Sequence, residues 1–472
     1  MSETKTAVLK ESELTETKNH TFENQAPAWT NFQKIIFRVS AVLILLICLP
    51  FDLKIFTALY GINWQNFYWE DLSGLVSSNF GAPRFLTLAS NSGKYGLGSY
   101  VNLEISFGIA LVAATIWSVL DNKRKSYNAF QYWIFVLARY RVGFGIIAWG
   151  YKKLIPIQMT LPTTTFLNTP FGDFREQKLY WQSVGIALAY EVFLGAAEVL
   201  AGFLLLYRKT TAPGAALVVV LLVNIAISNH AYDGGVHILS FTYAVIAVLI
   251  LWPYLPDIWN VLVNEKDVTP NHYYPEITSK GGQISRFAVK YSTHFIFVYL
   301  LFYLHWIDTA GYRFPQSKGI AQGHYDVTEF KVNGSERAFS PLDSVRWQDA
   351  IFEKWPTLSF KVNRKQQMDL DNRTRAGKML DIDMFYELSG LGGGRHFFYY
   401  AADTVKKELS LQNKNKAHRD QKQVLHYSQP TSDRIILSGI NEFKDSVYVV
   451  LDKSEKKYPL MQSRETAVIS GF

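Results

Sequence analysis

The stretch 191–231, EVFLGAAEVLAGFLLLYRKTTAPGAALVVVLLVNIAISNHA, decides the fold of this chain. It belongs to two apolar runs, 182–207 and 213–231, which are separated by a short turn that contains Arg208 and Lys209. Each run is close to the ~20 residues that a helix needs to cross the hydrocarbon core of a bilayer. The pattern therefore predicts two antiparallel membrane-spanning helices joined by a basic turn.

Further apolar runs lie on both sides of this pair. They occur at 35–52, 102–120, 131–155, 236–254 and 286–306. Together the runs predict seven membrane spans in a domain over 31–307. Residues 1–30 are polar and lack the apolar core of a signal peptide, so they predict a disordered cytoplasmic tail.

The charged residues divide the 472-residue chain into two parts. Residues 1–307 hold 42 Lys, Arg, Asp and Glu, whereas the shorter segment 308–472 holds 46. The first part is too apolar for a soluble domain, and the second has ordinary globular composition. We therefore expect an α-helical polytopic membrane bundle of about seven spans, followed by a β-rich domain over 308–472.

Strand and turn signals support the second domain. Asn333-Gly334 is typical of a hairpin turn, and Gly392-Gly393-Gly394 indicates a flexible loop. Alternating or β-branched runs bounded by Gly, Asn, Asp and Pro predict strands at 325–332, 358–362, 434–437 and 446–451.

Basic residues predict the orientation of the chain. Four groups precede the first span or join spans two to three, four to five and six to seven, and all fall on one side of the membrane: Lys34 and Arg38; Lys123, Arg124 and Lys125; Arg208 and Lys209; Lys266, Lys280 and Arg286. Cytoplasmic loops carry the excess of Lys and Arg. The pattern predicts a multi-pass protein of the bacterial inner membrane, with a cytoplasmic N-terminus and a periplasmic domain over 308–472.

Cysteine content and motifs exclude several classes of chemistry. Cys48 is the single cysteine, so the chain can form no internal disulfide, dithiol relay or zinc site with two thiolates. The sequence has no basic helix or Gly-rich phosphate loop, which argues against nucleic-acid binding. We expect no metal site; the partners we expect are the lipid bilayer and other membrane or envelope proteins.

Ionisable and amide side chains interrupt the apolar spans. Such groups are expensive at bilayer depth and normally face the bundle interior. Arg141 and Lys152 share one helix face, as do Glu191 and Glu198, which predicts pairing of Arg141 with Glu198 and of Lys152 with Glu191. These charges either lock the bundle or form a substrate, quinone or proton site. The candidate residues are Arg139, Arg141, Lys152, Lys153, Glu191, Glu198 and Asn224.

A second candidate cluster closes the fifth span. The segment 229–237 holds His230, Asp233 and His237 around a Gly pair. It suits a metal ion, a hydrogen-bonded quinone or substrate, or interfacial capping. His294 and His305 lie in the last span. A haem held between His305 and either His230 or His237 is a further alternative.

Part of the membrane domain resembles the DoxX family. The resemblance rests on Arg141 with Gly150-Tyr151-Lys152-Lys153-Leu154, on Glu191, Gly195 and Glu198-Val199-Leu200-Ala201-Gly202, on the basic turn after Leu204, and on His230. It covers 131–254 and implies a four-helix unit. DoxX-like proteins include a membrane subunit of thiosulfate:quinone oxidoreductase, and others associate with superoxide- and thiol-handling enzymes. The extra spans and the domain after 308 resemble larger DoxX-like proteins of Bacteroidetes.

Three functional hypotheses follow. The first is a quinone-linked redox component in which Arg141, Lys152 and Glu198 hold the quinol head; its electrons need a partner subunit, because the chain carries no flavin or haem motif. The second is a non-catalytic envelope scaffold or accessory subunit that binds a partner through its outer domain. The third is a transporter, which the intramembrane charges favour and the absence of an internal repeat does not.

Overall fold

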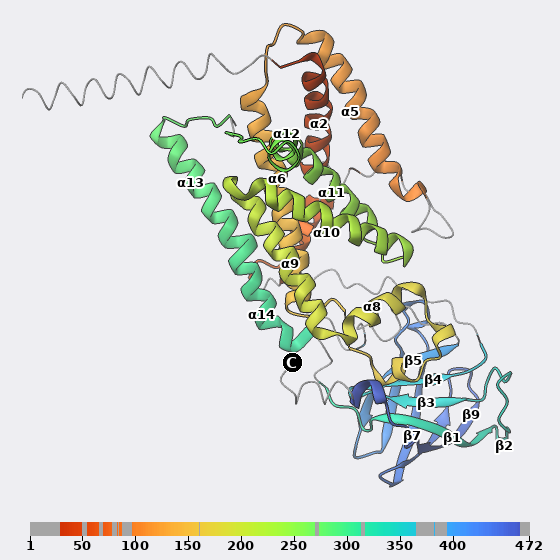
Figure 1. Ribbon diagram of the computed structural model, residues 1–472. Coiled ribbons are helices and arrows are strands. Elements are labelled where there is room, and N and C mark those ends of the chain that lie inside the picture. The colour runs from red at the N-terminus through yellow and green to blue at the C-terminus, as the bar shows by residue number, and fades with distance from the viewer. Residues whose placement is uncertain are drawn as a thin grey trace, which may run out of the picture.

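The computed structural model describes residues 29–49, 54–65, 69–77, 83, 85–86, 97–159, 161–269, 273–312, 317–364, 382 and 394–462. The predicted tail over 1–30 falls almost entirely outside the described residues, and so do Gly392 and Gly393 of the predicted loop. Within the described part, a helical bundle is followed by a β domain, as the composition predicts (Figure 1).

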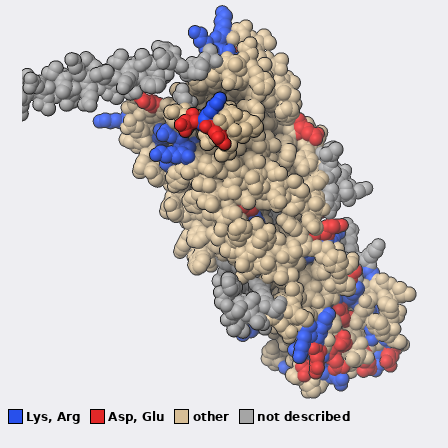
Figure 2. Space-filling model, viewed as in Figure 1, with Lys and Arg blue, Asp and Glu red and all other residues tan. Residues whose placement is uncertain are grey.

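Seven helical segments of the described chain are long and apolar enough to cross a bilayer. Their outward side chains are apolar; on α5, for example, Val112, Ile116 and Val119 are exposed. The visible face carries a wide belt almost without charged side chains, between charged groups at both ends (Figure 2). The chain is therefore a multi-pass membrane protein. The long helices are α2 (Asn31–Cys48), α5 (Val101–Leu120), α6 (Asn128–Leu154), α9 (Leu188–Leu206), α10 (Thr211–Ala231), α11 (His237–Leu251), and α13 (Lys280–His294), which continues through the π-helix η5 (Phe295–Leu300) into α14 (Leu301–Tyr312).

Short helices connect these segments. The helix after the sixth span is α12. Helix α4 lies inside the bundle: Trp69 is buried there, with its ring centroid 4.1 Å from that of His305. The short elements are α3 (Lys54–Gly61), α4 (Trp69–Ser77), η1 (Leu97–Tyr100), α7 (Thr164–Leu167), η2 (Phe171–Asp173), α8 (Glu176–Ile186), η3 (Arg208–Thr210), η4 (Trp252–Tyr254) and α12 (Leu255–Leu262).

Two glycine pairs bring α6 and α9 together. A Cβ on Gly202 would lie 2.7 Å from the carbonyl oxygen of Gly143, and a Cβ on Gly150 would lie 2.9 Å from that of Gly195. On each helix the two glycines are seven residues apart, so Gly143 and Gly150 form one stripe on α6, and Gly195 and Gly202 form one stripe on α9. Close backbone approach along a small-residue stripe is a common way to pack membrane helices. The stripe fixes which face of α6 meets α9.

The β domain is a closed barrel of eight antiparallel strands. Its order is β1-β3-β4-β5-β6-β7-β8-β9, and pairing of β9 with β1 closes the ring. The short strand β2 extends β1 through the predicted hairpin turn, in which Asn333 and Gly334 have φ of 51° and 79°. The strands are β1 (Gly323–Val332), β2 (Ser335–Glu336), β3 (Asp349–Phe352), β4 (Thr357–Lys361), β5 (Arg395–Asp403), β6 (Glu408–Asn413), β7 (Lys422–Thr431), β8 (Arg434–Ile440) and β9 (Ser446–Lys453).

Large side chains fill the inside of the barrel. The rings of Trp347 and Phe360 stack with centroids 3.9 Å apart, and Phe398 lies beside Phe360 at 5.5 Å. A cavity at the barrel end near Phe443 has a volume of only about 20 Å³. The barrel interior is thus a packed core, as in small barrels generally.

The outward face of β3 and β4 is also buried, because the connection 155–187 of the bundle covers it. Glu353 accepts hydrogen bonds from the N–H groups of Thr164 and Thr165, at 3.1 and 2.8 Å, and from the Thr165 hydroxyl at 2.7 Å. Lys361 forms an ion pair with Asp173 at 2.8 Å. These contacts anchor the barrel to the bundle.

Candidate functional site

A cavity of about 550 Å³ lies within the four-helix unit to which the DoxX resemblance points. Its walls come from α6, α8, α9, α10 and α11, and from the start of the connection 155–187. Most of the lining is apolar, and the polar side chains that line it are Trp149, Lys153, Gln158, Tyr180, Trp181, Ser183, Tyr190, Glu198, Asn224, Ser228, Asn229, Ser240 and Tyr243. Ligand pockets typically enclose roughly 300–1,000 Å³ and have this mainly apolar character.

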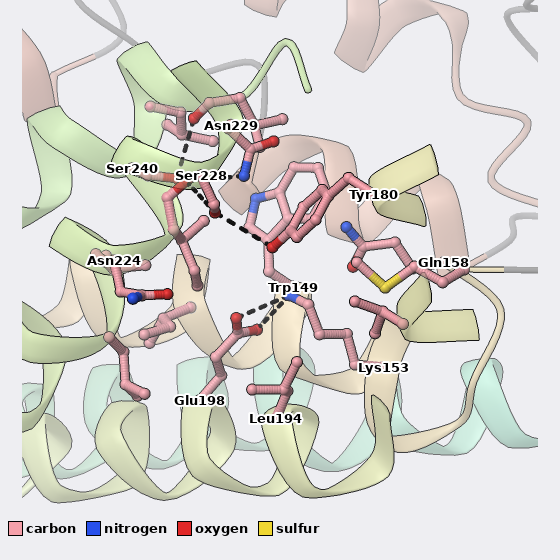
Figure 3. A pocket seen from close by; sticks show the side chains of 18 of the residues that line it. Trp149, Lys153, Gln158, Tyr180, Leu194, Glu198, Asn224, Ser228, Asn229 and Ser240 are labelled. Atoms are coloured by element: carbon pink, nitrogen blue, oxygen red, sulfur yellow. Dashed lines mark hydrogen bonds and ion pairs between the residues drawn. The ribbon is translucent and has the colours of Figure 1, made fainter. Parts of the chain in front are cut away.

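An ion pair between Lys153 and Glu198 forms part of the cavity wall (Figure 3). The ammonium nitrogen lies 2.7 and 2.8 Å from the two carboxylate oxygens, and the side chains are 8% and 3% exposed. A buried charge without its partner is strongly unfavourable, so removal of either side chain would leave the other without compensation. The cavity thereby presents a donor and an acceptor at one point of an otherwise apolar wall.

The predicted pairing between spans three and four thus exists, but the partners differ from those expected. Arg141 donates to the carbonyl of Val76 and lies 5.2 Å from the ring centroid of Tyr243. Lys152 lies over the ring of Trp149, at 4.2 Å. The glycine stripe explains why Lys153, and not Lys152, meets Glu198. Lys153 is three residues after Gly150 and so shares its face, whereas Lys152 is rotated by about 100° from Lys153 around the helix axis.

Glu191 and Arg139 bind backbone groups. Glu191 is fully buried and accepts a hydrogen bond from the Met159 N–H at 3.0 Å. Arg139 donates from Nε to the Leu205 carbonyl at 2.8 Å, in the last turn of α9. Such a cation stabilises the negative end of the helix dipole. Neither residue lines the cavity.

Several polar atoms at the cavity lack partners. Trp149 Nε1, Gln158 Oε1 and Asn229 Oδ1 are buried and make no hydrogen bond to any residue that the structure describes. Tyr180 and Ser228 bond each other, with their oxygens 3.2 Å apart. Buried polar groups are normally hydrogen-bonded, so three residues of the lining each carry a polar atom whose bonding capacity is unused within the described chain.

Part of the cavity wall is exposed on the outside of the bundle, at α9 and α10. Tyr190 on α9 is 51% exposed and Val220 on α10 is 68% exposed, although both line the cavity. Asn224, one turn after Val220, is exposed as well. These residues belong to membrane-spanning helices, so this part of the wall faces the hydrocarbon layer.

The second candidate cluster lies where α10 ends and α11 begins. The rings of His230 and His237 are 5.5 Å apart, and Tyr100 packs against both at 6.2 and 5.7 Å. The hydroxyl of Ser99 lies 3.1 Å from His237 Nε2. Asp233 takes φ of 51° in the turn between the helices. In the described part of the chain, no three His, Cys, Asp or Glu side chains gather closely enough to hold a metal ion.

The histidines of the last span have other neighbours. His305 packs against Trp69 and Tyr151, with ring centroids 4.1 and 6.1 Å away. His294 packs against Tyr140 at 5.6 Å. The histidine rings that pack against each other are His230 and His237, so the geometry offers no support for a haem held by His305.

The sequence missed the connection 155–187 as part of the site. Gln158 and Met159 at its start and Tyr180 near its end line the cavity, while its centre binds the barrel. Burial lowers the pKa of Lys178 in this connection to about 7, and its ammonium lies 4.0 Å from the ring centroid of Phe166. The one signal in the sequence was the density of aromatic and amide residues between two charged spans.

Comparison with known proteins shows a short similarity. A stretch of 72 residues is 39% identical to the uncharacterized protein YwoB of Bacillus subtilis (strain 168). It covers 15% of this chain and 47% of that protein, about half of its length. No family model and no solved structure matches the chain. This similarity does not establish a family.

Proposed function

We propose that this chain is a DoxX-like protein whose four-helix unit binds a quinone-type molecule and acts in redox chemistry together with a partner protein. The observation that carries the proposal is the cavity whose wall is partly exposed at α9 and α10 and which holds the Lys153–Glu198 pair. A quinone has an apolar tail, which suits the exposed part of the wall at α9 and α10, and a flat polar head, which suits the unpaired groups inside.

The residues present fit such a head. Its carbonyl oxygens accept hydrogen bonds, and the cavity offers Lys153 and the indole N–H of Trp149 as donors. In its reduced form the head donates, and Gln158 Oε1 and Glu198 are acceptors. The quinone would supply two-electron redox chemistry. Lys153 and Glu198 would orient the head and hold a proton at the Glu198 carboxylate or the Lys153 ammonium.

The proton route and the electron route would differ. Ser228, Asn229 and Ser240 line the cavity (Figure 3). Asn229 directly precedes His230, and Ser240 is three residues after His237, so these side chains would connect Glu198 to the His230–His237 cluster. The sequence offers no flavin or haem motif, so the electrons would come from a partner protein.

We further propose that the protein lies in a bacterial inner membrane with its N-terminus in the cytoplasm and its barrel in the periplasm. The basic loops support this orientation. Cys48 is buried, so thiol labelling has little background. Val405→Cys, in an exposed barrel turn, should react with a membrane-impermeant maleimide added to intact spheroplasts, and Lys123→Cys should react only after lysis. The opposite pattern would overturn the orientation.

The quinone proposal has a direct test. The purified full-length protein is extracted with solvent, and quinone is quantified per protein. We expect near-stoichiometric quinone in the wild type and at least a tenfold loss in Glu198→Gln, since a hydrogen bond to a charged group contributes about 1.5–3 kcal/mol. Asp452→Asn removes the carboxylate of an exposed ion pair on the barrel and is the matched control. A wild-type protein free of quinone would refute the proposal.

A second candidate function is an accessory subunit that binds a partner through its barrel. One end of the barrel favours it, because large apolar side chains are exposed there: Phe339, Leu342 and Phe443. Exposed apolar groups gathered at one site often mark protein interfaces. If this is the function, Phe339→Ser with Leu342→Ser should release a co-purifying protein and leave quinone content unchanged. A wild-type protein that purifies alone would remove this candidate.

A further inference from the structure

A separate group of four cations lies near the end of the bundle away from the barrel. Arg139 belongs to α6, Arg208 to η3 after α9, and Arg286 and Lys290 to α13. Figure 2 shows Lys and Arg side chains gathered at the end where α12 and α13 begin. None of the four lines the quinone cavity, so this group is independent of the proposed function.

Tyrosines join these cations into one cluster. The guanidinium of Arg208 lies 3.8 Å from the ring centroid of Tyr274, and the ammonium of Lys290 lies 5.5 Å from that of Tyr207. Arg139 lies close to Arg208, because it donates to the carbonyl of Leu205, three residues before Arg208, and Arg286 lies one helical turn before Lys290 on α13. The tyrosines of the cluster are Tyr132, Tyr140, Tyr207, Tyr254 and Tyr274.

The cluster has no anion of its own. In the parts of the chain that the structure describes, no ion pair joins Arg139, Arg208, Arg286 or Lys290 to a carboxylate. Acidic side chains also lie at this end of the molecule (Figure 2). The hydroxyls of Tyr132, Tyr140, Tyr207 and Tyr274 make no hydrogen bond to any described residue. The protein therefore gives these cations aromatic and carbonyl contacts, but no carboxylate partner within its described part.

The depth of the cluster identifies what compensates it. Arg208 follows directly after the membrane-spanning part of α9, so the cluster lies where lipid headgroups meet the helices. Arg binds phosphate in a planar, bidentate way, and phenols can donate to phosphate oxygens. We propose that the Arg139–Arg208–Arg286–Lys290 cluster binds the phosphate headgroup of an anionic phospholipid.

The general enrichment of basic residues on one side of a membrane protein would also place cations here. That explanation needs no tyrosines and treats all basic residues of this side alike. Lys123 and Lys125, in the exposed turn between α5 and α6, provide the contrast. They carry the same charge, and in the described chain no cation–π contact is seen for either ammonium group.

The test uses the full-length protein in micelles and native mass spectrometry. Phosphatidylglycerol, phosphatidylcholine and inorganic phosphate are added in separate arms. We compare Arg208→Gln/Lys290→Gln with the control Lys123→Gln/Lys125→Gln; Arg139 is left intact because it caps α9. A cation near an anionic lipid surface contributes about fivefold in affinity, so the first double variant should retain phosphatidylglycerol roughly twentyfold less than wild type.

Three results would overturn the proposal. Equal losses in both double variants would mean that only net charge matters. Equal retention of phosphatidylcholine and phosphatidylglycerol would exclude selection of an anionic headgroup. Binding of inorganic phosphate as tight as that of the lipid would make a free anion, not a phospholipid, the ligand. Selective loss of phosphatidylglycerol in Arg208→Gln/Lys290→Gln, with the control like wild type, would support it.

Discussion

The bundle keeps polar side chains inside and apolar ones on its surface, whereas the barrel fills its interior with aromatic rings and carries its charges outside. Both arrangements follow from the surrounding medium, since lipid accepts apolar side chains and water accepts charged ones. The consequence for function is that the bundle encloses a cavity of about 550 Å³ beside a buried ion pair, while the cavity described at the end of the barrel measures only about 20 Å³. A small-molecule site therefore belongs to the bundle, and the barrel contributes its surfaces.

The largest effect should come from the barrel core. Phe360→Ala removes a ring that stacks on Trp347 and should lower the free energy of unfolding by about 3–5 kcal/mol. Thermal unfolding of the full chain, monitored through the protease resistance of the barrel, measures this change in stability. The exposed Phe443→Ala should change stability by less than about 0.5 kcal/mol. Loss of quinone from Phe360→Ala protein that still folds would contradict the division of roles between the two regions.

Removing one charge of the Lys153–Glu198 pair should affect the stability of the bundle differently from replacing both charges. Lys153→Met leaves Glu198 buried without a partner and should destabilise the bundle by about 3 kcal/mol. Lys153→Met with Glu198→Leu replaces both charges by apolar groups and should recover most of that stability, yet still lose the ligand. Thermal unfolding and quinone content together measure it. A double variant that keeps its quinone would show that the pair only locks the helices.

Acid should weaken the barrel through Asp349. Arg395, at 2.7 Å, and His324, at 3.2 Å, hold the pKa of this carboxyl down at about 2 in spite of its burial. A lowered folded-state pKa stabilises the fold above about pH 4, and this stabilisation disappears as the pH falls toward 2. Asp349→Asn should therefore be less stable than wild type by about 2 kcal/mol at pH 6, and the two should converge near pH 2. Denaturant unfolding across this range measures the difference, and a constant gap would contradict it.

The smallest effect concerns the contact between the two regions. Thr165→Val removes the hydroxyl hydrogen bond to Glu353 but keeps the backbone one, so it should weaken docking by about 1 kcal/mol. Hydrogen exchange of the segment 163–173 should accelerate about fivefold. Thr115→Val, on the lipid-facing side of α5, is the matched control. Unchanged exchange would mean that Glu353 does not hold the barrel in place.

Local patterns predicted the spans and the strands β1, β4, β8 and β9, but neither β3, β5, β6 and β7 nor the contacts between the parts. Apolar runs of about 20 residues predicted all seven spans. The run 446–451 predicted the strand β9, and Asn333-Gly334 predicted the hairpin turn between β1 and β2. Closure of the barrel depends on pairing of β1 with β9, more than 100 residues apart, which no local pattern encodes.

The partner of Glu198 escaped prediction for a related reason. The residue that meets Glu198 depends on how α6 is rotated, and the Gly143–Gly150 stripe sets that rotation. Judged by charge alone, Arg141 and Lys153 are equivalent candidates. The docking face of the barrel was hidden too, because Ser359 and Glu353 are polar residues that become buried only when the connection 155–187 covers them.

A density map of the full-length protein in native-lipid nanodiscs tests the central claim most directly. The account predicts density for a flat ring within hydrogen-bond distance of Lys153 and Glu198, with a tail that leaves between α9 and α10, and no ligand inside the barrel. A cavity that holds only water, or a ligand enclosed by the barrel strands, would contradict it.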